Sequence, residues 1–231
     1  MIPVLTPCPL DDGHHILTGA VSLPDQLSTE GFEALWRLRP EEAPRIRMLG
    51  RMVALPRRQK AFGRDYAFSG TVSRAEPIPA ELAPFLAWAQ QQVDPRLNGL
   101  LVNWYDGALG EYIGAHQDSE RGLVAGAPIT TISVGAARTF RMQKEKTRRD
   151  FPVTNGSVIV IPWKTNRHWK HAVPHFAKDA GRRISVTLRA FSDEPSANPQ
   201  GKTKRQKARP IPKPPESADH AVQRAYQSAG Q

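Results

Sequence analysis

The sequence predicts an α+β protein with a β-sandwich or double-sheet jelly-roll core, a helical layer before the sheets and a disordered basic tail after them. Three observations indicate this fold. Two helical patterns come early, four short apolar runs bounded by Gly, Pro and Asn follow Pro95, and Lys, Arg and Pro fill the C-terminal end. At 231 residues the chain can form one well-buried domain with flanking segments.

The helical layer is expected from two stretches with apolar residues at helical spacing. In the first, Phe32, Leu35 and Trp36 follow Ser28 and Thr29, which can cap the first turn. The second covers residues 82–93, and Pro near its start is tolerated in the first turn. Its apolar positions are Leu82, Phe85, Leu86, Ala89 and Val93.

The four apolar runs have the length of strands, and the chain contains no internal repeat. They cover residues 100–105, 129–134, 157–161 and 183–191. Several short strands at this spacing are typical of a sandwich or a double-sheet jelly roll.

The last run alternates polar and apolar residues. In a strand, Arg183, Ser185, Thr187 and Arg189 share one face, and apolar side chains share the other. Two guanidiniums buried together repel and are costly to desolvate unless they are paired. This face therefore predicts an anionic ligand such as a dicarboxylate, which guanidinium groups bind bidentately. The alternative is an arginine-rich edge strand facing solvent or phosphates.

Asn103 and Tyr105 lie two residues apart in an otherwise apolar run. Both side chains can donate hydrogen bonds to an acid. The alternative is a strand end where polar side chains meet water.

Histidine and carboxylate side chains suggest a metal site. His116 and Asp118 would point to the same side of an extended segment and could reach one ion. We favour His171 as the third ligand, although spacing does not exclude His168 or His175. Two histidines and one carboxylate form a facial Fe(II) site with open positions for oxygen. The alternatives are a polar turn and a hydrogen-bonded structural histidine.

Composition limits the compartment and the partners. The formal charge of +10 favours polyanionic partners, of which nucleic acid is the commonest inside cells. A single cysteine, Cys8, can form neither a disulfide framework nor a cysteine zinc site. The chain has no apolar stretch long enough to span a bilayer and no secretory signal pattern. We therefore expect an intracellular protein without a membrane partner, cytoplasmic, or nuclear if the source is eukaryotic.

The basic C-terminal end is predicted to be a disordered tail. Residues 201–215 contain six Lys or Arg, no acid and several prolines. The tail could grip phosphates or simply be solvated. The predicted organisation is a segment with a helix at 1–45, a catalytic domain at 46–192 and the tail at 193–231.

Several motifs in fixed order carry a family resemblance. They are Pro56-Arg57-Arg58-Gln59, Tyr66-Ala67-Phe68-Ser69-Gly70, Asn103-Trp104-Tyr105, Ile113-Gly114-Ala115-His116-Gln117-Asp118-Ser119-Glu120, Ser133-Val134-Gly135-Ala136-Ala137-Arg138-Thr139-Phe140, Thr165-Asn166-Arg167-His168-Trp169-Lys170-His171 and the strand from Arg183 to Arg189. Over residues 55–191 the chain resembles the AlkB family of Fe(II)- and 2-oxoglutarate-dependent dioxygenases, and in particular its nucleic-acid repair branch.

The resemblance implies a double-stranded β-helix (jelly-roll) core and a role for each matched position. It implies the iron ligands His116, Asp118 and His171. The implied 2-oxoglutarate contacts are Asn103, Tyr105, Arg183, Ser185, Thr187 and Arg189. The implied substrate side is Phe68, stacked on a flipped base opposite His116, together with Tyr66, Glu120 and Arg138. The chain departs from close relatives at Ser185, where they carry Asn, and at Ser119, where an acidic residue is common.

The implied activity is oxidative dealkylation of N-alkylated bases in DNA, or in RNA, by a monomer. The reaction would consume O2 and 2-oxoglutarate at Fe(II) and release formaldehyde, succinate and CO2. A rival of the same fold is a hydroxylase acting on RNA, protein or a small molecule. A rival of another class is a basic nucleic-acid-binding module without chemistry.

Overall fold

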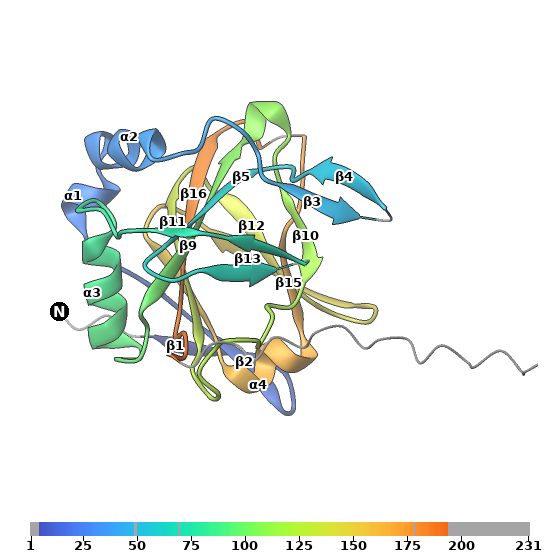
Figure 1. Cartoon of the computed structure of the whole chain (residues 1–231). Helices are drawn as coiled ribbons and strands as arrows, with labels where there is room; N and C mark the ends of the chain where they lie inside the picture. The colour runs from blue at the N-terminus through green and yellow to red at the C-terminus, as the bar shows by residue number, and fades with distance from the viewer. Residues whose placement is uncertain (1–4, 49, 69, 178, 194–231) are drawn as a thin grey trace, which may run out of the picture. The chain divides into compact units, whose positions relative to one another are not determined.

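Two β-sheets form the body of the protein. The computed structural model describes residues 5–48, 50–68, 70–177 and 179–193 (Figure 1). The larger sheet has eight strands in the order β1-β2-β14-β11-β16-β9-β5-β8, and the smaller has four in the order β10-β15-β12-β13. In the described residues, no helix has the length and apolar character needed to cross a bilayer. The predicted jelly-roll core is confirmed.

The larger sheet collects strands from both ends of the described chain. Its strands are β1 (Thr6–Asp11), β2 (His14–Ala20), β5 (Arg58–Phe62), β8 (Ala75–Glu76), β9 (Gly99–Asp106), β11 (Ile129–Gly135), β14 (Ser157–Ile161) and β16 (Arg182–Arg189). The four runs predicted as strands became β9, β11, β14 and β16, with ends that differ by up to two residues. All neighbouring pairs are antiparallel except β5 and β8.

The smaller sheet and two hairpins complete the strands. The smaller sheet contains β10 (Ile113–His116), β12 (Arg138–Lys144), β13 (Thr147–Val153) and β15 (Lys170–Val173). The hairpins are β3 (Arg45–Met48) with β4 (Arg51–Ala54), and β6 (Tyr66–Phe68) with β7 (Thr71–Ser73). The apolar runs of the sequence did not predict these strands. Six of the eight have four residues or fewer, and the seven-residue strands β12 and β13 contain charged residues and form no apolar run.

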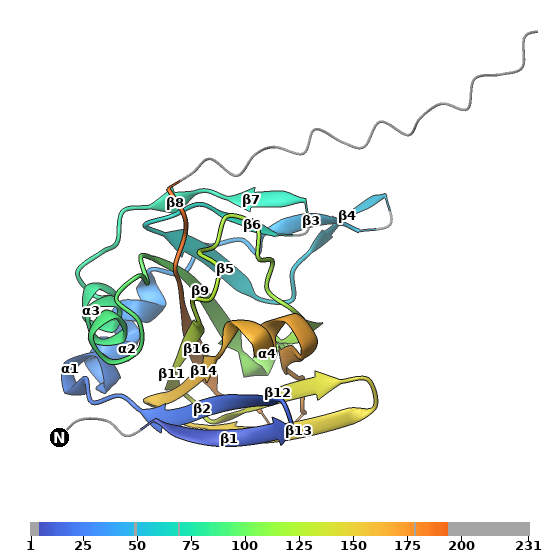
Figure 2. The ribbon, with the colours of Figure 1, turned by 90° about the horizontal axis from the view of Figure 1, so that it is seen from below.

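The helical layer lies against one face of the larger sheet. α1 (Pro24–Leu27), α2 (Thr29–Arg37) and α3 (Ala83–Gln92) gather on one side of the molecule (Figures 1 and 2), whereas α4 (Trp163–His168) lies apart from them and a 3-10 turn covers Gly107–Leu109. Ser28 caps α2, because its Oγ accepts a hydrogen bond from the Gly31 N–H at 3.0 Å. Both predicted helices therefore form, and the core between helices and sheet includes Leu35, Trp36, Phe85, Trp88 and Val102.

Alternation along β16 and its neighbours sends apolar and polar side chains to opposite faces. Ile184, Val186 and Leu188 pack in the core shared with the helices. The intervening positions of β16 point instead toward the space between the two sheets, as the pleat of a strand requires. β16 therefore has one apolar and one polar face, as its sequence predicts.

Gly135 lets β11 end close to α2. Its φ of +91° is strained for residues with a side chain, and a Cβ atom there would lie 2.4 Å from the Phe32 ring. The turn therefore requires glycine, and it seats the helical layer tightly on the sheet.

The N-terminal part of the chain belongs to the same body as the motifs in residues 55–191. β2 pairs with β14, so the segment predicted as residues 1–45 supplies the edge strand β1 and its neighbour β2 to the larger sheet, as well as the helices α1 and α2. The predicted tail, residues 193–231, lies outside the described residues except for Asp193.

Candidate metal centre and its cavity

A cavity of about 430 Å³ opens between the two sheets. The larger sheet contributes side chains from β9, β11 and β16, the smaller sheet from β10, β12 and β15, and β5 and β6 close one side. Those that carry polar groups include Arg57, Gln59, Tyr66, Asn103, Tyr105, His116, Asp118, Thr131, His171, Ser185, Thr187 and Arg189. Residues far apart in sequence therefore meet in one concave site.

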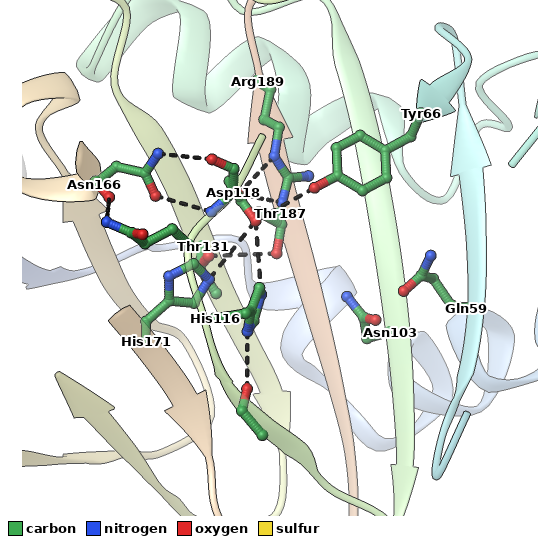
Figure 3. Close-up of polar contacts among 12 residues, drawn as sticks. Gln59, Tyr66, Asn103, His116, Asp118, Thr131, Asn166, His171, Thr187 and Arg189 are labelled. Atoms are coloured by element: carbon green, nitrogen blue, oxygen red, sulfur yellow. Dashed lines mark hydrogen bonds and ion pairs between the residues drawn. The ribbon is translucent and has the colours of Figure 1, made fainter. Parts of the chain in front are cut away.

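Three of these side chains converge on one point. The ligand atoms of His116, Asp118 and His171 all lie within 4.8 Å of one another. Oδ1 of Asp118 is 3.6 Å from Nε2 of His116 and 3.9 Å from Nε2 of His171. The histidines are opposite each other in the register of β10 and β15, which brings their rings to a centroid distance of 4.2 Å (Figure 3).

Of the three candidate histidines, only His171 points into the cavity. His168 is exposed, and its Nδ1 contacts the Lys164 carbonyl at 3.0 Å. His175 is exposed as well, and its ring lies 6.4 Å from that of Tyr112. The pairing of β15 with β10 and β12 thus places the favoured residue, His171, in the cavity and leaves the other two candidates outside it.

Asp118 is held ionised in a buried position. Nε and Nη2 of Arg189 donate to its Oδ2 at 2.8 and 2.5 Å, and the Tyr66 hydroxyl donates to Oδ1 at 3.3 Å. Burial alone would raise the pKa of Asp118, but Arg189 and the two neighbouring histidines hold this pKa well below its usual range. Oδ1 faces the histidines while Oδ2 is engaged by the arginine.

The histidines present neutral rings toward the same point. Burial lowers the pKa of His116, and burial together with His116 lowers the pKa of His171 to about 3. Nδ1 of His116 lies 2.9 Å from the Gly114 carbonyl, which fits a tautomer with Nδ1 protonated and Nε2 free to bind a metal. The ring of Phe140 stacks on His171 at a centroid distance of 5.8 Å.

The arginines of β16 have different surroundings. Arg189 lines the cavity and retains one guanidinium nitrogen, Nη1, without a hydrogen-bond partner among the described residues. Arg183 is fully buried behind the lining, over the Tyr105 ring at 5.3 Å, and burial lowers its pKa to about 10. It donates from Nη2 to the Ser133 hydroxyl at 2.8 Å, while its Nε and Nη1 find no partner in the part of the chain that the structure describes.

Asn103 and Tyr105 lie on the same side of β9 and both line the cavity. Oδ1 of Asn103 accepts from Nε of Arg57 at 2.8 Å, and Nη2 of Arg57 donates to Oε1 of Gln59 at 2.9 Å. The amide nitrogen of Gln59 is buried and has no partner within the described residues. This row of amides and guanidinium therefore ends in a free donor at the cavity wall.

The predicted substrate side is divided by the structure. Tyr66 and Phe68 line the cavity and stack with a centroid distance of 5.7 Å. Glu120 does not line the cavity, and it pairs with Arg167 at 3.0 Å in a partly exposed position. Arg138 is also outside the lining, where it is buried and contacts Asp179 and the Gly181 carbonyl at 3.5 and 3.4 Å. A substrate role for these last two residues stays a prediction.

The donor set suits Fe(II). Two neutral imidazoles and one carboxylate give three ligands on one side of an ion and leave its other positions free, which is the arrangement that non-haem Fe(II) oxygenases use. No cysteine ligand is available here, since the single cysteine, Cys8, does not line the cavity. Its Sγ is hydrogen-bonded to the Thr18 hydroxyl at 3.2 Å.

The residues around the metal point also suit a dicarboxylate. Arg57, Arg183 and Arg189 are buried, whereas Asp118 is the one carboxylate in the cavity lining. A buried excess of cations with unpaired N–H groups calls for an anion. Arg183, Arg189 and Asn103 are the residues that would hold 2-oxoglutarate.

Some site residues were absent from the roles predicted by sequence. Arg57 and Gln59 lie in the motif of residues 56–59, to which no role was assigned, and Asn166 lies in the motif of His171 without a role of its own. Thr131 on β11 completes the polar wall through its hydroxyl, 3.3 Å from that of Thr187. The polar residues at 131 and 133, amid the apolar 129–134 run, were the signal that could have identified this wall.

Comparison with known proteins agrees with this chemistry. The family model described as the 2OG-Fe(II) oxygenase superfamily matches residues 25–189. Human DNA oxidative demethylase ALKBH2 is 30% identical over 159 residues, which are 63% of this chain and 60% of that protein. The bovine protein of the same name is 30% identical over 160 residues, 63% of this chain and 56% of the relative. This chain thus spans less than two thirds of the length of these relatives.

More distant similarities extend over smaller or more divergent regions. Rat alpha-ketoglutarate-dependent dioxygenase alkB homolog 3 is 28% identical over 113 residues, 44% of this chain and 38% of the relative. The solved structure of OsALKBH1 matches with a TM-score of 0.52 and 15% identity, covering 75% of this chain and 97% of that one. At that identity the structural match shows the fold alone.

Proposed function

This chain belongs to the 2OG-Fe(II) oxygenase superfamily and, within it, to the AlkB family, and we propose that it oxidatively removes N-linked alkyl groups from bases in DNA. The observation that carries the proposal is one cavity in which three elements meet. They are the cluster of His116, Asp118 and His171, the buried guanidinium groups of Arg57 and Arg189, and the aromatic pair of Tyr66 and Phe68.

The chemistry depends on a bound metal and co-substrate. Fe(II), with 2-oxoglutarate and O2, would supply the oxidation that hydroxylates the N-alkyl carbon, after which a methyl group leaves as formaldehyde, with succinate and CO2 as the other products. His116, Asp118 and His171 would hold the iron, and Asn103, Arg183 and Arg189 would hold 2-oxoglutarate.

The chain's own residues set the geometry and charge for this reaction. Arg189 keeps Asp118 ionised and turns its Oδ1 toward the two histidine Nε2 atoms. Burial raises the pKa of the Tyr66 hydroxyl well above its ordinary value, so this group stays a hydrogen-bond donor to Asp118. The low exposure of Asp118 and His171, 4% and 8%, limits the access of bulk water to the centre.

The cavity wall also supports a base as substrate. Tyr66 and Phe68 offer stacked aromatic rings beside the ligand cluster. Enzymes that modify bases take the target out of the stack, at a cost of a few kcal/mol, and aromatic stacking offsets part of that cost. The net charge of +10 favours binding to the phosphate backbone. The relatives named DNA oxidative demethylase ALKBH2 support DNA as the polymer.

The direct test measures formaldehyde released from oligonucleotides that contain 1-methyladenine or 3-methylcytosine. We expect release that requires both Fe(II) and 2-oxoglutarate and that disappears with a chelator. DNA and RNA versions of each oligonucleotide identify the preferred polymer. If 2-oxoglutarate turns over to succinate while every oligonucleotide stays methylated, a hydroxylase acting on another substrate class replaces the proposal.

Histidine variants provide a matched control. His171→Ala should abolish formaldehyde release because it removes one of the three proposed iron ligands. His168→Ala and His175→Ala remove exposed histidines within four residues of it and should keep wild-type rates. Full turnover by His171→Ala would refute the ligand assignment, and iron-independent binding of oligonucleotide without turnover by the wild type would indicate a non-catalytic module.

A further inference from the structure

Asp118 differs from the two histidines in how its backbone is supported. His116 ends β10 and His171 lies in β15, so strand pairing fixes both of them. Asp118 lies two residues beyond β10 in a segment without regular structure. A side chain alone must therefore anchor the backbone of this ligand.

We propose that Asn166 is the positioning residue that presets Asp118 for the metal. This role rests on the proposed iron site. Oδ1 of Asn166 accepts a hydrogen bond from the Asp118 N–H at 3.0 Å, and its Nδ2 donates to the Asp118 carbonyl at 3.0 Å (Figure 3). The side-chain amide of Asn166 therefore hydrogen-bonds to both the N–H and the carbonyl of Asp118.

The surroundings make this bracket rigid. Asn166 is 1% exposed, so water does not compete for its two bonds. Its own carbonyl accepts from Nε2 of Gln117 at 3.0 Å, and its N–H donates to the Pro162 carbonyl at 3.0 Å inside α4. Three hydrogen bonds therefore join the loop that carries Asp118 to α4, two from the Asn166 side chain to Asp118 and one from Gln117 to the Asn166 carbonyl.

α4 connects this bracket to a second ligand. The helix ends at His168, and the chain enters β15 at Lys170, directly before His171. Asn166 thus couples the position of Asp118 to the segment that delivers His171. Arg189 and Tyr66 hold the carboxylate of Asp118 while Asn166 holds its backbone, so both ends of this ligand are determined before a metal arrives.

Residues that orient metal ligands without touching the metal typically contribute a factor of roughly 10 to 100 in metal affinity. Asn166→Ala removes both bonds to Asp118 and leaves its N–H and carbonyl without these partners. The loop can then rotate, and the metal must order the ligand as it binds. We expect the Kd for a divalent metal to rise by roughly 10- to 100-fold.

The chain contains a matched control outside the cavity lining. Asn98 makes the same pair of bonds to one residue, accepting from the Phe191 N–H at 2.8 Å and donating to the Phe191 carbonyl at 2.9 Å. Neither Asn98 nor Phe191 lines the cavity. Asn98→Ala therefore removes the same pair of hydrogen bonds from a residue that is not a proposed metal ligand.

The experiment titrates metal-free protein with Co(II) under anaerobic conditions and follows the visible absorption of the bound ion, without co-substrate or nucleic acid. The melting temperature of each metal-free protein is measured in parallel. Asn166→Ala should weaken Co(II) binding, whereas Asn98→Ala should lower the melting temperature and keep the wild-type Kd. Asn166→Asp retains the acceptor for the Asp118 N–H and loses the donor, so its Kd should lie between those of the wild type and Asn166→Ala.

The outcomes separate this inference from the proposed function. If the wild type binds Co(II) and Asn166→Ala binds it equally well, the positioning role is wrong and the metal site stands. If Asn98→Ala weakens binding as much as Asn166→Ala, the effect is one of general stability and the role is also wrong. If Asn166→Ala does not fold, a wild-type Kd for Asn166→Asp overturns the role. If the wild type binds no metal, the proposed function fails together with it.

Discussion

Replacing Arg183 with methionine should change stability and co-substrate binding in different ways. The guanidinium is fully buried, and burial lowers its pKa from the ordinary value of an arginine to about 10, so folding disfavours the charged form by about 3 kcal/mol. Its Nη2 donates a hydrogen bond to the Ser133 hydroxyl, whereas Nε and Nη1 have no partner among the described residues. The hydrogen bond to Ser133 and the contact with the Tyr105 ring together stabilise the folded state by roughly 2–4 kcal/mol. Arg183→Met should therefore change the unfolding free energy of metal-free protein by no more than about 1 kcal/mol.

Arg189→Met is the matched comparison, because Arg189 is buried but paired with Asp118. Breaking a buried ion pair from one side costs about 3–5 kcal/mol, so this variant should be far less stable. Urea denaturation of both metal-free variants measures the difference.

Binding of 2-oxoglutarate provides the second readout for Arg183→Met. Loss of one partner of a buried charge pair costs about 2–5 kcal/mol, which corresponds to a rise in Kd of about 30-fold or more. Calorimetric titration of the metal-loaded protein without O2 measures this Kd. Refutation would be a loss of more than about 3 kcal/mol in the metal-free variant, which would mean that Arg183 has a structural partner. An unchanged Kd would equally show that Arg183 does not serve the co-substrate.

Three further outcomes are expected. Burial lowers the pKa of His171 to about 3, so below about pH 6.5 the unfolded chain takes up a proton that the folded metal-free chain does not, and stability is lost as the pH falls. His171→Gln should therefore flatten the dependence of the unfolding free energy on pH between pH 6 and 4, by up to about 1.4 kcal/mol per pH unit. Equal slopes for the variant and the wild type would contradict this reasoning. Phe68→Ala should lower kcat/KM for methylated oligonucleotides by roughly 5- to 150-fold, because base stacking on an aromatic ring contributes about 1–3 kcal/mol. The KM for 2-oxoglutarate should stay unchanged. A parallel change in both constants would argue against a base-stacking role. Gly135→Ala should destabilise the protein by about 1–3 kcal/mol in thermal unfolding, because a Cβ there meets Phe32, whereas Gly114→Ala has open space and should be milder.

Local patterns predicted the elements that lie along continuous stretches of the chain. The helical spacing around Phe85 and the alternation from Arg183 to Arg189 depend only on the periodicity of side chains along one element. These patterns were sufficient for the helical layer, for four strands of the larger sheet and for the polar face that lines the cavity. The motif containing His116 and Asp118 predicted two of the three ligands in the proposed iron site, and the family resemblance implied His171 as the third.

Long-range packing decided the rest. The register of β15 placed His171, which the sequence already favoured, in the cavity, and His168 and His175 are exposed. Packing also put Glu120 and Arg138 outside the cavity lining and brought Asn166 to Asp118 across 48 positions of sequence. Periodicity describes which way a side chain points from its own strand, but it contains no information on which strand lies opposite. A chelating site needs atoms within a few ångströms of each other, and only the pairing and stacking of the sheets sets distances on that scale.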